Sequence, residues 1–174
     1  DEEEALQAAT LNLTAGRIAR RSAAFALAFD CFVAGKAHLE ERAWDEHYAL
    51  TLDLEAGAAE AAYLCGDWQA LAVHIASVKG NARTLLEQLP VWDVEIDARI
   101  ARQDYSGAVD TALEILEKLD IEIPGEPTEA DVGGALTQAM ESLTAFSPEE
   151  LMSLPLAHSP ETLATMRIEA RIVS

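Results

Sequence analysis

The sequence predicts an all-α protein in which antiparallel helix pairs stack as an irregular α-solenoid. Alanine, leucine and glutamate dominate the chain and β-branched residues are few, a composition that favours helix over strand. Apolar residues recur at steps of three and four, which is the spacing of one helix face. A short turn followed by an aromatic residue occurs twice, and each time it joins two predicted helices.

The apolar periodicity places the helices along the chain, and capping signals define several of their starts. Ser147-Pro148-Glu149-Glu150 supplies an N-cap hydroxyl, a proline in the first turn and a carboxylate that reaches back, which is a capping box. Ser159-Pro160 repeats the cap and the proline, and Thr128 with Asp131 is a weaker version of the same start. The predicted helices cover residues 4–20, 22–39, 43–64, 67–80, 83–101, 105–119, 128–144, 147–153 and 160–173.

One linker is evident, at Ile121-Glu122-Ile123-Pro124-Gly125-Glu126-Pro127. Two prolines and a glycine within four residues cannot continue a helical hydrogen-bond ladder. We therefore predict three helical hairpins in residues 1–119 and a Pro/Gly linker in 120–127. Residues 128–174 are predicted to form C-terminal helices that continue or cap the array.

The two turn motifs are Gly66-Asp67-Trp68-Gln69-Ala70-Leu71 and Gln103-Asp104-Tyr105-Ser106-Gly107-Ala108. An aromatic ring in the first turn of the second helix should wedge against the first helix, and a small or apolar residue three positions later should allow close packing. On this interpretation Trp68→Ala would cost about 3–5 kcal/mol of stability. The predicted structural repeat positions are Gly16, Phe25, Ala28, Gly66, Trp68, Leu71, Trp92, Tyr105 and Ala108.

This order of aromatic, small and glycine positions resembles the tetratricopeptide repeat, a 34-residue helix–turn–helix unit. The spacings from Phe25 to Trp68 and from Trp68 to Tyr105 are longer than that unit. Ala59 also stands where the repeat usually has glycine. The resemblance therefore implies a tetratricopeptide-like solenoid with irregular stacking.

A second resemblance lies in four segments between residues 11 and 155, namely Leu11 to Phe25, Ala43 to Trp68, Leu116 to Pro127 and Ser147 to Pro155. These segments resemble the helical region downstream of the ATPase module in large multidomain bacterial signalling proteins. Such proteins combine a serine/threonine-kinase-like domain, a STAND-type ATPase, and GAF or sensor histidine-kinase domains. The resemblance implies a helical-repeat sensor or coupling arm that carries none of the parent protein's catalytic residues.

The charge balance limits the possible partners. With 12 basic and 31 acidic residues the formal net charge is −19, which repels nucleic acid and anionic membrane surfaces. Arg17, Arg20 and Arg21 form a local basic group, which we interpret as balancing nearby glutamates. A protein partner should be a basic peptide segment or an adjacent domain of the same polypeptide, and its binding should weaken as salt rises.

Cysteine placement and the apolar pattern favour a cytoplasmic location. Cys31 and Cys65 lie within apolar helical patterns, so we expect reduced, buried thiols. No apolar run reaches the length of a membrane span, and the acidic start at Asp1 is unlike a signal peptide. The abrupt beginning and end suggest a piece of a longer protein.

Residue types that carry chemistry do not converge in the sequence. There is no phosphate-binding GxxxxGK[ST] loop, and Gly133-Gly134 lies in a helical pattern without the strand that a dinucleotide site requires. Neither the Glu-x-x-His nor the HExxH metal motif occurs at His38, His47, His74 or His158. We predict no catalytic residue, no cofactor and no metal.

The sequence thus favours a non-catalytic interaction or coupling module. Candidate partner-binding residues are Asn12, Arg20, Glu55, Tyr63 and Arg99. The alternative is a small-molecule sensor with a pocket between helices near Trp92 and Tyr105. A helical enzyme is the third possibility, and the oligomeric state stays open.

Overall fold

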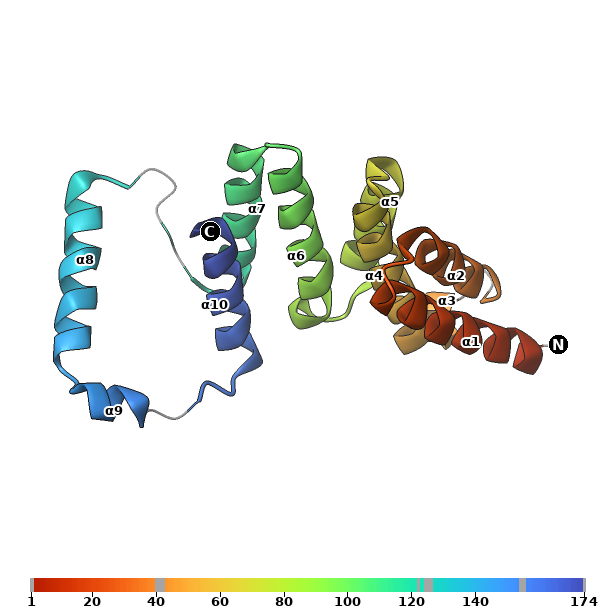
Figure 1. The fold of residues 1–174 in the computed structure, drawn as a ribbon, viewed down its shortest axis with the longest axis horizontal. Helices are drawn as coiled ribbons and strands as arrows, with labels where there is room; N and C mark the ends of the chain where they lie inside the picture. The colour runs from red at the N-terminus through yellow and green to blue at the C-terminus, as the bar shows by residue number, and fades with distance from the viewer. Residues whose placement is uncertain (1, 40–42, 122, 124–126, 154–155, 174) are drawn as a thin grey trace. The chain divides into compact units, whose positions relative to one another are not determined.

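The computed structural model describes residues 2–39, 43–121, 123, 127–153 and 156–173, and this part of the chain contains helices and turns without any strand (Figure 1). The predicted all-α class is therefore confirmed. The helices are α1 (Glu2–Arg21), α2 (Phe25–Ala37), α3 (Ala43–Glu46), α4 (Tyr48–Cys65), α5 (Trp68–Asn81), α6 (Leu85–Ala101), α7 (Tyr105–Lys118), α8 (Glu129–Thr144), α9 (Pro148–Met152) and α10 (Pro160–Val173).

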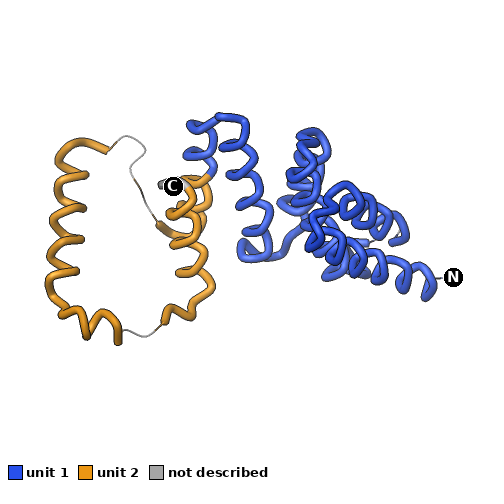
Figure 2. Tube along the Cα trace, in the orientation of Figure 1, with its two compact units in different colours: residues 1–111 blue, residues 112–174 orange. Residues whose placement is uncertain are grey.

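The chain forms two compact units, residues 1–111 and 112–174 (Figure 2). The division falls inside α7, between Thr111 and Ala112. Much of the predicted Pro/Gly linker, residues 122 and 124–126, lies outside the described residues. The domain boundaries drawn from the sequence therefore stay predictions.

The three hairpin turns of the first unit share one geometry. In each turn the residue two positions before the second helix has a positive φ. These residues are Ala23 at 56°, Gly66 at 72° and Gln103 at 62°. The next backbone N–H bonds back five residues, as in Asp67 N to Ala62 O and Asp104 N to Arg99 O, both at 2.9 Å. This is the Schellman arrangement that satisfies the last carbonyls of a helix. The two turns with similar sequence motifs, at Gly66 and Gln103, therefore also have the same local backbone structure.

Aspartates start the second helices of the last two hairpins. Asp67 accepts the Ala70 N–H at 3.0 Å, and Asp104 accepts the Gly107 N–H at 3.1 Å. The first hairpin has Ala24 in this place, without a side-chain cap. These contacts explain why the aspartate precedes the aromatic residue in the repeated motif: it satisfies N–H groups that have no partner inside the helix.

Stacked helices of the first unit enclose its core. Within this unit α1 contacts α2, α2 contacts α4, and α4 contacts α5. The first helices of the hairpins also contact one another, α1 with α4 and α4 with α6. Two clusters of buried side chains fill the interior, one around Phe32 and Leu54 and the other around Ile75 and Val78. This arrangement is a stack of antiparallel pairs, as the sequence predicts.

The predicted helix 43–64 is two helices in the structure, interrupted at His47. The φ of His47 is −128°, outside the helical range. The buried hydroxyl of Thr51 donates to the carbonyls of Ala43 at 2.9 Å and His47 at 3.0 Å. Both carbonyls therefore have a hydrogen-bond donor despite the interruption of the helix. A threonine inside an apolar pattern gives little indication of such a break, so the periodicity misses it.

The second unit has buried residues only at a few of its described positions. Every residue described from 127 to 153 is exposed, whereas Ala112, Ile115 and Leu116 of α7 and Ala164 and Ile168 of α10 are buried. The capping boxes predicted at the starts of α8 and α9 are both present. Among the described helices, none has both the length and the apolar character needed to cross a bilayer.

Two expectations about burial are wrong, one for the thiols and one for the aromatic rings of the hairpin turns. Cys65 is exposed and Cys31 is half-buried, so neither is a core residue. Trp68 is 38% exposed and Tyr105 is 61% exposed, so their rings are not deep wedges. Both residues occupy N-terminal positions of helices, where the side chain leans over the preceding turn and toward solvent. Local equivalence of the turns was therefore predictable, but the depth of the rings was not.

Candidate functional site

A hollow lies on the surface that the first helices of the three hairpins share. We call α1, α4 and α6, where they line this hollow, the first-helix surface. The hollow has a volume of about 200 Å³. Its lining residues are Arg17, Arg20, Phe32, Asp53, Ala56, Gly57, Glu60, Pro90 and Val94. Contacts of α4 with both α1 and α6 hold these residues together.

Phe32 of α2 forms the floor of the hollow, between two glycines. A Cβ atom at Gly16 of α1 would lie 2.6 Å from the Phe32 ring, and one at Gly57 of α4 would lie 2.9 Å from it. Real Cβ atoms do not approach a neighbour this closely. The two glycines therefore let α1 and α4 approach the ring of Phe32, which is 2% exposed. Phe32 is thereby one of the residues that line the hollow.

Ion pairs across α1 and α4 form the polar rim of the hollow. Arg17 pairs with Asp53 at 3.0 Å, and Arg20 pairs with Glu60. All four side chains are at least one-third exposed, so the pairs contribute little to stability and exchange readily with an incoming charged group. The rim therefore exposes both carboxylates and guanidinium groups. The expectation that glutamates balance these arginines is confirmed for Arg20, which pairs with Glu60, whereas the acid beside Arg17 is an aspartate, Asp53.

A second hollow lies between α5 and α6, and we call it the α5–α6 groove. Its volume is about 340 Å³, at the lower end of the range for small-molecule sites. Leu71, Ile75 and Ala98 give it an apolar base, and the exposed ring of Trp68 lies at its edge. Lys79, Glu95, Arg99 and Arg102 line it with charge. The groove therefore combines an apolar floor with more basic than acidic side chains.

The charged groups of the α5–α6 groove are linked to one another. Glu95 accepts from Lys79 at 2.5 Å and from Arg99 at 3.1 Å, and Arg99 also donates to Asp104 at 3.0 Å. Burial lowers the pKa of Arg99, but pairing with the two carboxylates outweighs this and raises the pKa. Lys79 also lies 2.8 Å from the centroid of the Trp92 ring. These links hold Lys79 of α5 and Arg99 of α6 against the same carboxylate, Glu95.

Glu55 is a buried carboxylate at the contact of three helices. Its side chain has no exposed surface; it pairs with Lys36 of α2 and lies 2.6 Å from Nδ1 of His74 of α5. Burial raises the pKa of the Glu55 carboxyl, but hydrogen bonds from His74 and Lys36 outweigh burial and hold the pKa below its ordinary value. The ring of Phe29 packs edge-on against His74, with centroids 5.7 Å apart. This cluster joins successive hairpins, and a buried charge satisfied in this way is structural.

A polar cluster joins the starts of α4 and α6. The Tyr48 hydroxyl donates to Glu87 at 2.8 Å and accepts the Arg83 N–H at 2.8 Å, while the Arg83 guanidinium lies 3.7 Å from the Tyr48 ring centroid. The hydrogen bond from Tyr48 lowers the pKa of Glu87, together with bonds from Thr84 and Arg83. Thr84 and Glu87 also form the capping box of α6. The cluster fixes where the third hairpin begins relative to the second.

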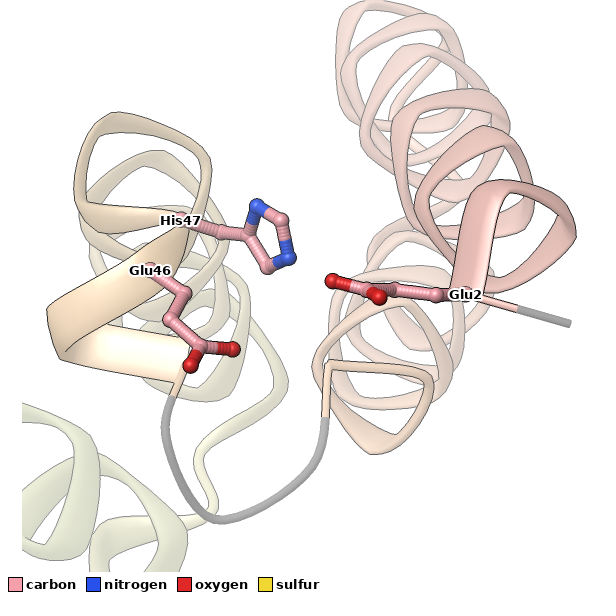
Figure 3. A group of neighbouring side chains, drawn as sticks. All are labelled: Glu2, Glu46 and His47. Carbon is pink, nitrogen blue, oxygen red and sulfur yellow. The ribbon is translucent and has the colours of Figure 1, made fainter.

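One group of side chains has the composition of a cation site. Glu2 of α1, Glu46 of α3 and His47 converge, with one possible ligand atom from each within 4.8 Å of the others (Figure 3). Carboxylate oxygen and imidazole nitrogen are ligands that zinc accepts. Both carboxylates are exposed, and exposed acidic groups are common at this spacing without an ion. Their convergence therefore does not by itself define a metal centre.

The predicted repeat positions fall into buried and exposed groups. Gly16, Ala28, Leu71, Trp92 and Ala108 are buried, and Phe25 is half-buried at the start of α2. Gly66 has the positive φ of the hairpin turn. Only Trp68 and Tyr105 differ from their expected role, as described above.

The predicted partner-binding residues do not lie together. Arg20 lines the first-helix hollow, and Arg99 lines the α5–α6 groove. Tyr63 contacts the ring of Trp68, with centroids 6.4 Å apart, and Asn12 bonds to the carbonyl of Ala8 within α1. Glu55 is a correction, because a side chain without exposed surface cannot contact a partner. Its acidic type in a helical pattern suggested exposure, but its two basic neighbours come from other helices.

Sequence reasoning missed most of the first-helix hollow. Asp53, Gly57 and Glu60 of α4 face it with Pro90 of α6, and none of them was singled out. The signal was present, because Asp53, Gly57 and Glu60 recur at steps of four and three on one face of α4. Trp92 and Tyr105, expected to mark a pocket, do not line either hollow.

Comparisons with known proteins gave no match among protein-family models, curated proteins or solved structures.

Proposed function

We propose that this chain is a non-catalytic protein-interaction and coupling module of a multidomain bacterial signalling protein. The observation that carries the proposal is the hollow that the first helices of three hairpins share, with a charged rim from α1 and α4. Stacked hairpins of this kind present a continuous surface on which a segment or a neighbouring domain can rest. The resemblance to the helical region of STAND-type ATPase and sensor histidine-kinase proteins supports the coupling role and a cytoplasmic setting.

The partner on this surface is a basic segment. The net charge of −19 favours the approach of a positive partner, and Asp53 and Glu60 supply exposed carboxylates at the hollow. A basic side chain on the partner replaces Arg17 or Arg20 as the counterion of these acids. Rim ion pairs of this kind set the rate and salt dependence of association more than its final strength.

A selection from a displayed peptide library, with binding then measured by fluorescence anisotropy, tests this function. Peptides that bind the first-helix surface should be basic and should lose about tenfold in affinity when Asp53→Asn and Glu60→Gln are combined. Asp30→Asn with Asp110→Asn is the matched control, because both residues are exposed on second helices. Equal losses in the two double variants would place binding elsewhere.

A second candidate function is a small-molecule sensor, favoured by the volume and lining of the α5–α6 groove. The groove would fit a metabolite with an apolar part and an anionic group. The apolar part would lie on the apolar floor, and the anionic group would face Lys79, Arg99 and Arg102. A thermal-shift screen separates this function from the first one, since a ligand at 100 times its dissociation constant adds about 2.7 kcal/mol of stability. Quenching of Trp68 emission by the same compound, lost in Arg102→Ala, identifies the groove as its site.

A further inference from the structure

The helix α8 has an apolar face that no other described residue covers. Val132, Leu136, Met140 and Leu143 recur at steps of four, four and three, so they share one side of the helix. They are 57%, 62%, 59% and 61% exposed. Single exposed apolar residues are ordinary on proteins, but a continuous stripe of four large ones indicates an interaction surface. We call these four residues the α8 stripe.

The start of α8 is well defined, although all of its residues are exposed. The Thr128 hydroxyl accepts the Asp131 N–H at 3.3 Å and Asp131 accepts the Thr128 N–H at 2.9 Å, forming the capping box. The interior contains Gly133 and Gly134, whose neighbourhoods are open space. Glycine lowers helix stability, and a helix of 16 residues is marginal alone in water. A contact along the stripe would supply the missing stabilisation.

The charge around the stripe selects its occupant. From Leu119 to Met166 the sequence contains no lysine or arginine. The acidic residues in this stretch are Asp120, Glu122, Glu126, Glu129, Asp131, Glu141, Glu149, Glu150 and Glu161. A second copy would bring like charges together, and an anionic lipid surface would be repelled. A segment with basic residues beside an apolar face matches both the stripe and its acidic surroundings.

We propose that the α8 stripe binds a basic amphipathic helix of another protein or domain. The partner helix places apolar residues at positions i, i+3, i+4 and i+7 against the stripe and lysine or arginine at the edges. Met140 lets the surface adapt to differently shaped apolar residues, because its side chain is unbranched and flexible. This interaction uses the second unit and does not depend on the first-helix surface proposed above.

The test uses the full 174-residue chain and a synthetic probe of the same length as α8. The probe is a labelled peptide with leucine along one helix face and lysine on the other, and binding is followed by fluorescence anisotropy. A peptide of the same composition with leucines scattered around the helix is the control for simple charge attraction. We expect the patterned peptide to bind at least about tenfold more tightly than the scattered one.

Variants of the chain locate the binding surface. Leu136→Gln with Met140→Gln keeps residues of good helix propensity and should weaken binding of the patterned peptide about tenfold or more. Leu11→Gln with Val73→Gln is the matched control, since both residues are exposed apolar residues of the first unit, and it should leave binding unchanged. A Cβ atom added at Gly133 or Gly134 would have nothing within 4 Å. The double variant Gly133→Ala with Gly134→Ala should therefore tighten binding severalfold, because alanine stabilises the helix that binds.

Several outcomes would overturn the proposal. Equal binding of the patterned and scattered peptides, or equal losses in both glutamine pairs, would show that the stripe is not recognised. A large fall in melting temperature for Leu136→Gln with Met140→Gln would show that the chain itself covers the stripe. Self-association in sedimentation equilibrium that this variant abolishes would assign the stripe to a second copy.

Discussion

The sharpest structural prediction concerns the glycines on either side of Phe32. Gly16→Ala places a Cβ atom where the nearest ring atoms would lie 2.6, 2.8 and 2.9 Å away. The ring cannot withdraw freely, because Gly57 of α4 lies against the same ring. Overpacking of this kind costs about 1–3 kcal/mol, and the helix preference of alanine over glycine returns about 1 kcal/mol. We expect a net destabilisation of up to about 2 kcal/mol.

Gly80→Ala is the matched control within the same unit. A Cβ atom at Gly80 of α5 has nothing within 4 Å, so this substitution gains helix propensity without a clash. It should stabilise the unit by about 0.5–1 kcal/mol. The two alanine substitutions therefore have opposite predicted signs, although the chemical change is identical.

Urea unfolding followed by tryptophan fluorescence measures both effects. All three tryptophans, Trp44, Trp68 and Trp92, belong to the first unit, so their emission reports its unfolding. A cycle with Phe32→Leu tests the cause, because the smaller side chain should abolish most of the cost of Gly16→Ala. A stabilisation by Gly16→Ala as large as that by Gly80→Ala would refute this account of the helix contact.

Three other outcomes follow from the structure. Glu55→Gln should cost about 2–3 kcal/mol of stability at neutral pH, because it removes a buried charge from its partners. The folded pKa of Glu55 lies below its ordinary value of 4.5, so its stabilising effect should be complete above pH 4.5 and should fade as the pH falls through the folded pKa. The variant should therefore show a flatter acid denaturation curve than the unchanged chain. Trp92→Ala, which empties a site only 3% exposed, should cost about 3–5 kcal/mol, whereas Trp68→Ala should cost only about 1–2 kcal/mol by urea unfolding. Chelation with EDTA should leave the melting temperature unchanged, and a fall of several degrees would show that the cluster in Figure 3 holds a resident cation.

The helices themselves were largely predictable because their causes are local. The α8 start at Thr128 and the α9 start at Ser147 follow from capping boxes that the sequence displays. The paired turns at Gly66 and Gln103 follow from the order of polar, acidic and aromatic residues. The break at His47 was missed because the Thr51 hydroxyl bonds to the carbonyls of Ala43 and His47. The apolar pattern of the sequence does not show where this buried hydroxyl points.

The candidate surfaces were less predictable because they depend on contacts between distant residues. Glu55 is acidic and lies in a helical pattern, yet Lys36 and His74 from two other helices make it an interior residue. Conversely, Gly57 lines the hollow beside Phe32, which comes from a different helix, α2. Periodicity assigns residues to helix faces, but which faces meet is decided by side chains far apart in the sequence.

Hydrogen–deuterium exchange on the bound and free chain locates the binding surface. With a library-selected basic peptide bound, we expect new protection in α4 between Asp53 and Glu60, and in the parts of α1 and α6 that line the hollow. Protection confined to α2 and α5, with α1, α4 and α6 unchanged, would contradict the claim that the first helices form the binding surface.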